Sequence, residues 1–159
     1  MLIFAVPNLP IMKNKQAPRS IFLVDDDCDE QMLFSDAFAS VLPKEKLRTF
    51  DSAIALLDCL KNAETLPCIL FLDLNMPLMD GIECLQEIRR YPRYEKLFVV
   101  IYSTSVWERD RDETFKNGAN VYVAKPTDLF RLQTIIKKVL DLFQQSEKIT
   151  KKENFFVKA

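Results

Sequence analysis

Polar side chains follow several short apolar runs of this sequence, at the point where each run ends. They are Asp25, Asp26 and Asp27, then Asp73, Ser103 and Lys125. Carboxylates that pack together repel one another unless protons or a cation intervene. Oxygen ligands with water sites left open favour Mg²⁺, which also binds phosphate oxygens. A nearby lysine and hydroxyl would stabilise a transferring phosphoryl group, so the set predicts an aspartate nucleophile assisted by a metal.

The apolar runs have the pattern of strands in a parallel sheet. Residues 21–24 (IFLV), 69–72 (ILFL) and 97–102 (LFVVIY) are continuously apolar, as expected of strands buried on both faces. Residues 47–50 and 121–124 predict two more strands. Because the carboxyl ends of parallel strands meet at one edge, where ligands bind in such sheets, the polar side chains should converge there.

Helices are predicted between the strands and after the last one. Apolar residues recur at helical spacing over 30–42, 82–90 and 128–143. Ser52 is a predicted N-cap for a further helix, and a charged helix over 107–117 is closed by Gly118. The alternation of strands and helices predicts an α/β fold, with helices on both faces of the sheet.

Composition excludes several other functional classes. The chain has 159 residues, 48% hydrophobic and 28% charged, which fits one soluble domain. A net charge of −1 gives no support for a nucleic-acid partner. The sequence has no histidine, so any phosphohistidine must come from a partner protein. Its only glycines, Gly81 and Gly118, cannot form a phosphate-binding loop.

The cysteines and the N-terminus indicate a cytoplasmic protein. None of the four cysteines forms a C-x-x-C pair, which favours reduced thiols over a zinc site. Residues 1–11 are apolar but short and contain two prolines, so neither a signal peptide nor a membrane span is expected. Whether the native start is Met1 or Met12 stays open.

Four separated motifs resemble the receiver domains of bacterial two-component response regulators. They are VDDD at 24–27, FLDLNMPLMDG at 71–81, Ser103, and YVAKP at 122–126. The resemblance covers roughly residues 20–143, and the motifs match in order and spacing. It implies a flavodoxin-like (βα)5 three-layer sandwich, with a parallel five-stranded sheet in the order 2-1-3-4-5. The expected organisation is an N-terminal extension over 1–19, a receiver domain over 20–145 and a tail over 146–159.

The resemblance also implies roles for the acidic residues. Asp73 matches the phosphorylated aspartate. Asp25 and Asp26 match the acidic pair that holds Mg²⁺, with Asp26 as the direct ligand. Asp73 itself and the backbone carbonyl of Asn75 match the remaining protein ligands of the metal.

Three further residues match parts of the phosphorylation switch. Ser103 matches the switch hydroxyl that also stabilises the phosphoryl group, and Tyr122 matches the aromatic switch. Lys125 matches the conserved lysine. A cis bond between Lys125 and Pro126 is predicted from the resemblance, aiming the amine at the acceptor.

The implied partners are proteins. A histidine kinase or histidine phosphotransfer protein would donate the phosphoryl group, and an unknown effector would read it. A homodimer through the two C-terminal helices is also considered, whereas nucleic acid and membranes are not expected. The domain is not an enzyme in the usual sense, since it catalyses only its own phosphotransfer and dephosphorylation.

Other interpretations stay open at this stage. A Mg²⁺-dependent phosphohydrolase would place an acid two residues after the nucleophile, where this chain has Asn75. A receiver-like binding module without phosphorylation and a flavodoxin-like nucleotide or flavin binder are further alternatives. Taken singly, one of the first three acids could cap a helix, Lys125 could be a surface lysine and Tyr122 could be plain core. The tail could be solvated, with Phe155 and Phe156 able to dock on the domain or a partner.

Overall fold

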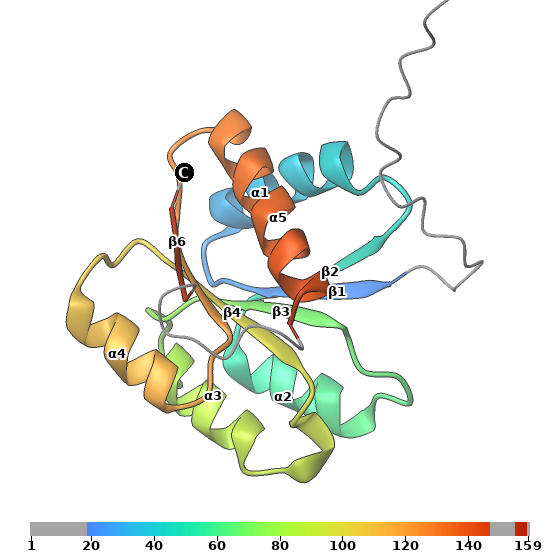
Figure 1. Cartoon of the computed structure of the whole chain (residues 1–159). Helices are drawn as coiled ribbons and strands as arrows, with labels where there is room; N and C mark the ends of the chain where they lie inside the picture. The colour runs from blue at the N-terminus through green and yellow to red at the C-terminus, as the bar shows by residue number, and fades with distance from the viewer. Residues whose placement is uncertain (1–18, 147–154, 159) are drawn as a thin grey trace, which may run out of the picture.

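A parallel sheet between two layers of helices forms the core of the protein (Figure 1). The computed structural model describes residues 19–146 and 155–158. The strand order is β2-β1-β3-β4-β5-β6, and every neighbouring pair is parallel. The strands are β1 (Ser20–Val24), β2 (Lys46–Phe50), β3 (Ile69–Leu72), β4 (Phe98–Ser103), β5 (Val121–Ala124) and β6 (Phe156–Val157). The flavodoxin-like order 2-1-3-4-5 is confirmed, with one further strand beyond β5.

The helices lie on both faces of the sheet. They are α1 (Cys28–Val41), α2 (Ala53–Asn62), α3 (Gly81–Arg89), α4 (Glu108–Lys116) and α5 (Leu129–Gln144), with a short 3₁₀ turn, η1, at Pro92–Tyr94. Helices α1 and α5 cover one face, and α2, α3 and α4 cover the other (Figure 1). Alternate strand residues therefore enter two separate hydrophobic clusters, Phe22 and Val24 in one and Ile21 and Leu23 in the other. This double burial explains the continuously apolar strand sequences.

Polar side chains start most of the helices. Asp27 caps α1 by accepting from the backbone amides of Asp29 and Glu30, so one of the three adjacent acids is a cap. Ser52 caps α2 as predicted, and Asp80 forms a capping box with Glu83 at α3. These caps start α1 and α3 immediately after the loops that follow β1 and β3. The loops are therefore anchored close to the sheet edge.

The described part of the C-terminal segment docks on the domain, as was open for Phe155 and Phe156, and is not a solvated tail. This part, residues 155–158, pairs with the free edge of β5 and buries Phe155. The predicted N-terminal extension over 1–19 lies almost wholly outside the described residues, as do residues 147–154 of the tail. In the part of the chain that the structure describes, no helix has the length and apolar character needed to cross a membrane.

Candidate functional site

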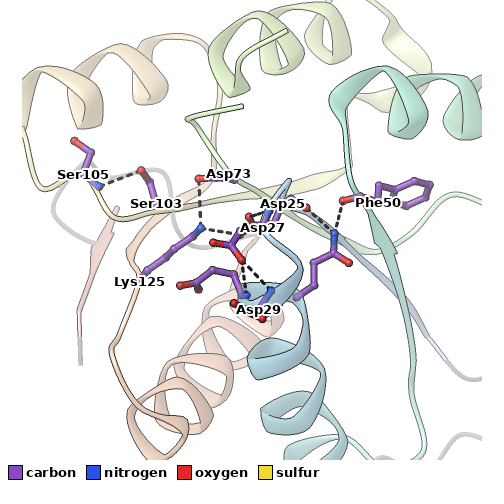
Figure 2. Close-up of polar contacts among 10 residues, drawn as sticks. Asp25, Asp27, Asp29, Phe50, Asp73, Ser103, Ser105 and Lys125 are labelled. Atoms are coloured by element: carbon purple, nitrogen blue, oxygen red, sulfur yellow. Dashed lines mark hydrogen bonds and ion pairs between the residues drawn. The ribbon is translucent and has the colours of Figure 1, made fainter. Parts of the chain in front are cut away.

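The polar residues that follow the strands converge at the carboxyl edge of the sheet (Figure 2). The backbone amide of Asp25 donates to Phe50 of β2, and that of Asp73 donates to Val24 of β1, each at 3.0 Å. The amide of Lys125 donates to the Ser103 carbonyl at 2.8 Å. The sheet hydrogen bonding thus continues past the strand ends. It fixes the Cα atoms from which the polar side chains project.

Lys125 joins the two buried carboxylates of this edge. Its Nζ lies 2.6 Å from Asp25 Oδ2 and 3.6 Å from Asp73 Oδ1. The side chain of Lys125 is only 6% exposed, which excludes the alternative that it is a solvated surface lysine. Its ammonium also lies over the ring of Tyr102, 5.2 Å from the centroid, a cation–π contact that helps hold it inside the protein.

The predicted cis bond before Pro126 is wrong. No cis peptide bond occurs in residues 19–146 or 155–158, so Lys125 and Pro126 are joined in trans. The lysine reaches the pocket without it. Its backbone is anchored to β4, and its long side chain extends from there to the carboxylates of Asp25 and Asp73.

Three carboxylates form a cluster suited to a divalent cation. Oxygen atoms of Asp25, Asp26 and Asp73 all lie within 4.8 Å of one another. Asp25 and Asp73 are buried and Asp26 is exposed, so the cluster opens toward solvent on one side. Such an all-oxygen donor set, with room for water, fits Mg²⁺ or Mn²⁺. Asn75 lies two residues beyond Asp73 on the following loop and is exposed.

Together, burial and the neighbouring charges shift the pKa values of Asp73 and Lys125 upward. Burial raises the pKa of Asp73 to about 6, with the attraction of Lys125 opposing this rise and the charge of Asp25 adding to it. Burial by itself lowers the pKa of Lys125, but the hydrogen bond that Lys125 donates to Asp25 and the charge of Asp73 raise it overall. At neutral pH the lysine is therefore protonated and Asp73 is largely ionised. A cation in the cluster would favour the ionised form further.

A hydrogen-bonded group behind the site contains one residue that the sequence analysis missed. The Ser105 amide donates to Ser103 Oγ at 3.1 Å, and the Ser105 carbonyl accepts from the Tyr122 hydroxyl at 2.8 Å. The Ser105 hydroxyl donates to Asp110 of α4 at 2.5 Å. Ser105 thus links Ser103, β5 and α4. Its place in the hydroxyl run 103–105 was the available signal, but its partners come from distant segments.

Gly81 allows the loop after Asp73 to close tightly. A Cβ at this position would lie 2.3 Å from the Asp73 carbonyl oxygen and 2.8 Å from the Leu74 Cα. The Gly81 amide donates to the Leu74 carbonyl at 2.9 Å, which joins the start of α3 to this loop. The Asp80-Gly81 pair looks like an ordinary turn in the sequence, but the structure shows a close backbone approach beside Asp73.

The fold and this edge together define a flavodoxin-like α/β protein with an acidic site. The family model described as the response regulator receiver domain matches residues 21–137. The chain therefore belongs to the response regulator receiver domain family, whose members are signalling domains of two-component systems. The expected resemblance is confirmed.

Individual relatives agree with this assignment. The chain is 30% identical to the probable methanogenesis regulatory protein FilR2 of Methanothrix harundinacea, over 77% of this chain and 81% of the relative. By contrast, it spans only 11% of the sensor histidine kinase CheAY of Helicobacter pylori, to which it is 30% identical over 86 residues.

Solved structures show the same arrangement of elements. The phosphorylated cyanobacterial phytochrome response regulator RcpA is 28% identical, with a TM-score of 0.74 over 82% of this chain and 96% of that one. The Mn²⁺-bound form of the response regulator Rcp1 is 26% identical, with a TM-score of 0.69 over 84% of this chain and 98% of that one.

We expect Asp26→Ala to weaken Mg²⁺ binding more than Asp25→Ala does. Asp25 already accepts from Lys125 and from the Asp27 amide, whereas the Asp26 carboxylate faces solvent. Removing a residue that holds a metal partly through water typically lowers metal affinity about 10–100-fold. We expect the loss of Mg²⁺ affinity in Asp25→Ala to fall in that range. Magnesium titration followed by Trp107 fluorescence or calorimetry would measure both.

The matched control for this comparison is Asp27→Ala. It removes the third adjacent acid and the cap of α1, which should lower the free energy of unfolding by about 1 kcal/mol. It should leave Mg²⁺ affinity near that of the wild type. Equal losses for Asp25→Ala and Asp26→Ala would mean that the two acids do not divide the roles in this way.

Proposed function

We propose that this receiver domain accepts a phosphoryl group on Asp73 from a partner phosphohistidine, with Mg²⁺ as cofactor. The observation that carries the proposal is the buried contact of Lys125 with Asp25 and Asp73, beside an open carboxylate cluster. An ionised carboxylate next to a protonated lysine is poised to attack phosphorus and to have the new charge stabilised. A solved relative at 28% identity is phosphorylated and another at 26% is Mn²⁺-bound, which supports the same chemistry here.

In this proposal the site residues divide the chemical tasks among them, and Asp73 has two. An Asp73 oxygen forms the bond to phosphorus while the bond from phosphorus to the partner's imidazole nitrogen breaks. Asp25, Asp26, Asp73 and the Asn75 carbonyl hold the metal, which supplies positive charge to the phosphoryl oxygens when it is bound. Lys125 binds one phosphoryl oxygen, and Ser103 donates a hydrogen bond to another. Because Lys125 is already paired with Asp73, it needs little movement.

The phosphohydrolase alternative has less support from the site. The position two residues after Asp73 is Asn75, whose amide cannot transfer a proton as a general acid or base. We therefore infer a signalling acceptor whose phosphate is removed slowly. The phosphodonor would be a histidine kinase or a histidine phosphotransfer protein. Exposed apolar side chains on the loops beside the site, Leu78, Val106 and Trp107, offer such a partner a contact surface.

The output of the switch is assigned to the face formed by α4, β5 and α5. Tyr122 of β5 is bonded to Ser105, whose amide in turn holds Ser103. If Ser103 moves toward a phosphoryl group, the hydrogen bonds that join Ser103, Ser105 and Tyr122 must rearrange as well. An effector protein or a second copy of the chain would read the change as a population shift between two conformations.

The proposed function is tested by treating the protein with acetyl phosphate in the presence of Mg²⁺. Intact-mass analysis should show one added phosphoryl group, because the site supplies the nucleophile and needs only a high-energy donor. The same incubation with EDTA should leave the protein unmodified. If Mg²⁺ and acetyl phosphate, and separately a phosphorylated histidine phosphotransfer protein, all leave the mass unchanged, the domain is not a phosphoacceptor.

A further inference from the structure

The edge of β5, which belongs to the proposed output face, is covered by the chain's own C-terminal residues. Strand β6 pairs in parallel with β5, with Tyr122 opposite Phe156 and Val123 opposite Val157. The Tyr122 amide donates to the Phe155 carbonyl at 2.7 Å. Phe155 is only 3% exposed, so this is a packed contact.

Contacts from both flanking helices hold this segment in place. The Phe155 ring lies 5.1 Å from the ring of Phe115 on α4, and Arg111 of α4 lies 4.3 Å from the centroid of Phe156. On the other side, Lys138 of α5 donates to the carbonyl of Lys158 at 3.2 Å. Residues 155–158 therefore span the whole face from α4 across β5 to α5.

The same segment packs against the aromatic residue of the switch. The ring centroids of Phe155 and Phe156 lie 6.2 Å and 6.0 Å from that of Tyr122. Tyr122 is fully buried, and its hydroxyl is held by the Ser105 carbonyl. Tyr122 is therefore buried in this structure without a phosphoryl group on Asp73. The C-terminal segment packs against the buried ring.

A continuous series of contacts thus runs from the phosphoryl site to the C-terminus. Ser103 ends β4 at the site, and its hydroxyl accepts from the Ser105 amide. Ser105 holds the Tyr122 hydroxyl, and Tyr122 pairs with strand β6 through both its backbone and its ring. Each step is a direct hydrogen bond or ring contact, so a displacement of Ser103 changes the surroundings on which residues 155–158 dock.

We propose that residues 155–158 are a built-in ligand of the β5 edge, and that their docking and the phosphorylation of Asp73 favour each other. This inference rests on the proposed function. Docking keeps the Tyr122 side chain buried, and a Ser103 that moves toward the phosphoryl group would vacate space for the buried ring. Coupling between two sites is reciprocal, so the docked segment strengthens phosphoryl binding, and phosphorylation tightens docking.

The contacts also define the partner that this face accepts. A partner must add an extended strand to the edge of β5, with two adjacent aromatic side chains followed by a β-branched one, as in Phe-Phe-Val here. Strand addition supplies main-chain hydrogen bonds, and the pockets for the side chains supply specificity. Such a partner strand competes with β6, because both need the same edge.

The test compares the full chain with a chain that ends at residue 154, using beryllofluoride and Mg²⁺ as the phosphoryl mimic. Calorimetry should show beryllofluoride binding weakened about fivefold or more by the truncation, in the usual range of allosteric coupling. A synthetic peptide of residues 153–159 should restore most of the loss. Hydrogen exchange at the amides of 155–157 should slow in the full chain when beryllofluoride binds.

Two point variants separate coupling from simple loss of packing. Phe155→Ala removes a ring that contacts Tyr122, whereas Val157→Ala removes buried surface of the same C-terminal segment from the opposite hydrophobic cluster. Phe155→Ala should reproduce the truncation. Val157→Ala removes less apolar surface and no ring beside Tyr122, so it should weaken beryllofluoride binding less than Phe155→Ala does. Equal affinities of the truncated and full chains would overturn the inference and leave the proposed function standing.

Other outcomes have equally direct meanings. If the full chain itself binds no beryllofluoride, the proposed function fails, and this inference fails with it. Sedimentation would show whether a dimer forms on activation. If residues 155–158 are protected from hydrogen exchange only in that dimer, the occupant of the edge is the segment of a second copy of the chain. That result would overturn the intramolecular assignment.

Discussion

Asp73→Asn is expected to take up no phosphate from acetyl phosphate and Mg²⁺, a complete loss that intact-mass analysis would detect. The amide keeps the size of the side chain but has no anionic oxygen to attack phosphorus. The substitution also removes one of the three carboxylates of the cluster and the ion pair between Asp73 and Lys125. Asp25 cannot substitute as acceptor, because its carboxylate is fully buried and bonded to Lys125 and the Asp27 amide.

Asp51→Asn is the matched control for this variant. Asp51 also follows a strand at the carboxyl edge of the sheet, β2, but it is exposed and lies outside the carboxylate cluster of Asp25, Asp26 and Asp73. Its substitution changes the same chemical group and should leave phosphorylation at the wild-type level. A stable phosphate on Asp73→Asn, or its loss in Asp51→Asn, would assign the acceptor elsewhere.

Gly81→Ala is expected to destabilise the fold by about 3 kcal/mol, at the upper end of the range for overpacking substitutions. The added methyl group would lie 2.3 Å from a backbone oxygen of Asp73 and 2.8 Å from the Leu74 Cα. Main-chain atoms at the end of β3 cannot move aside without breaking sheet hydrogen bonds. Urea unfolding followed by circular dichroism would measure the change in midpoint.

The other glycine provides a comparison of a different kind. Gly118 follows the end of α4 with a φ of +90°, and the nearest atoms to a Cβ there would be side-chain atoms of Arg89, at 3.2 Å or more. Gly118→Ala should therefore cost about 1 kcal/mol, the penalty for a left-handed conformation. If both substitutions cost the same, the close approach beside Asp73 relaxes more easily than its geometry implies.

The order of chemical features along the chain could be predicted without tertiary structure. Strands buried on both faces must be continuously apolar, so the runs at 21–24, 69–72 and 97–102 were visible as strands. An acid, a hydroxyl or a lysine directly after such a run must lie at one sheet edge, because parallel strands share their direction. Asp25, Asp73, Ser103 and Lys125 were found in this way, and the structure brings all four to the same edge.

Local capping signals were equally readable, because a cap depends on residues within three positions of it. Ser52 caps the start of α2, and Gly118 follows the end of α4 with a positive φ, as predicted. Trp107 shows the limit of this reasoning, since the predicted helix over 107–117 includes it, whereas in the structure it is the N-cap position before α4 and is 75% exposed. Whether a side chain at a helix start is covered depends on the neighbouring loops, which the local sequence does not describe.

The tertiary structure alone decided the features that need partners distant in the sequence. Strand β6 is a two-residue strand that exists only because the edge of β5 and the ring of Phe115 are there to receive it. The role of Ser105 depends on its hydrogen bonds with Tyr122 and Asp110, which only the folded chain brings beside it. The trans bond at Pro126 is compatible with a buried lysine because the sheet fixes the backbone of Lys125. Strand pairing and close packing depend on the neighbours of a residue more than on its own type, and the folded chain supplies those neighbours.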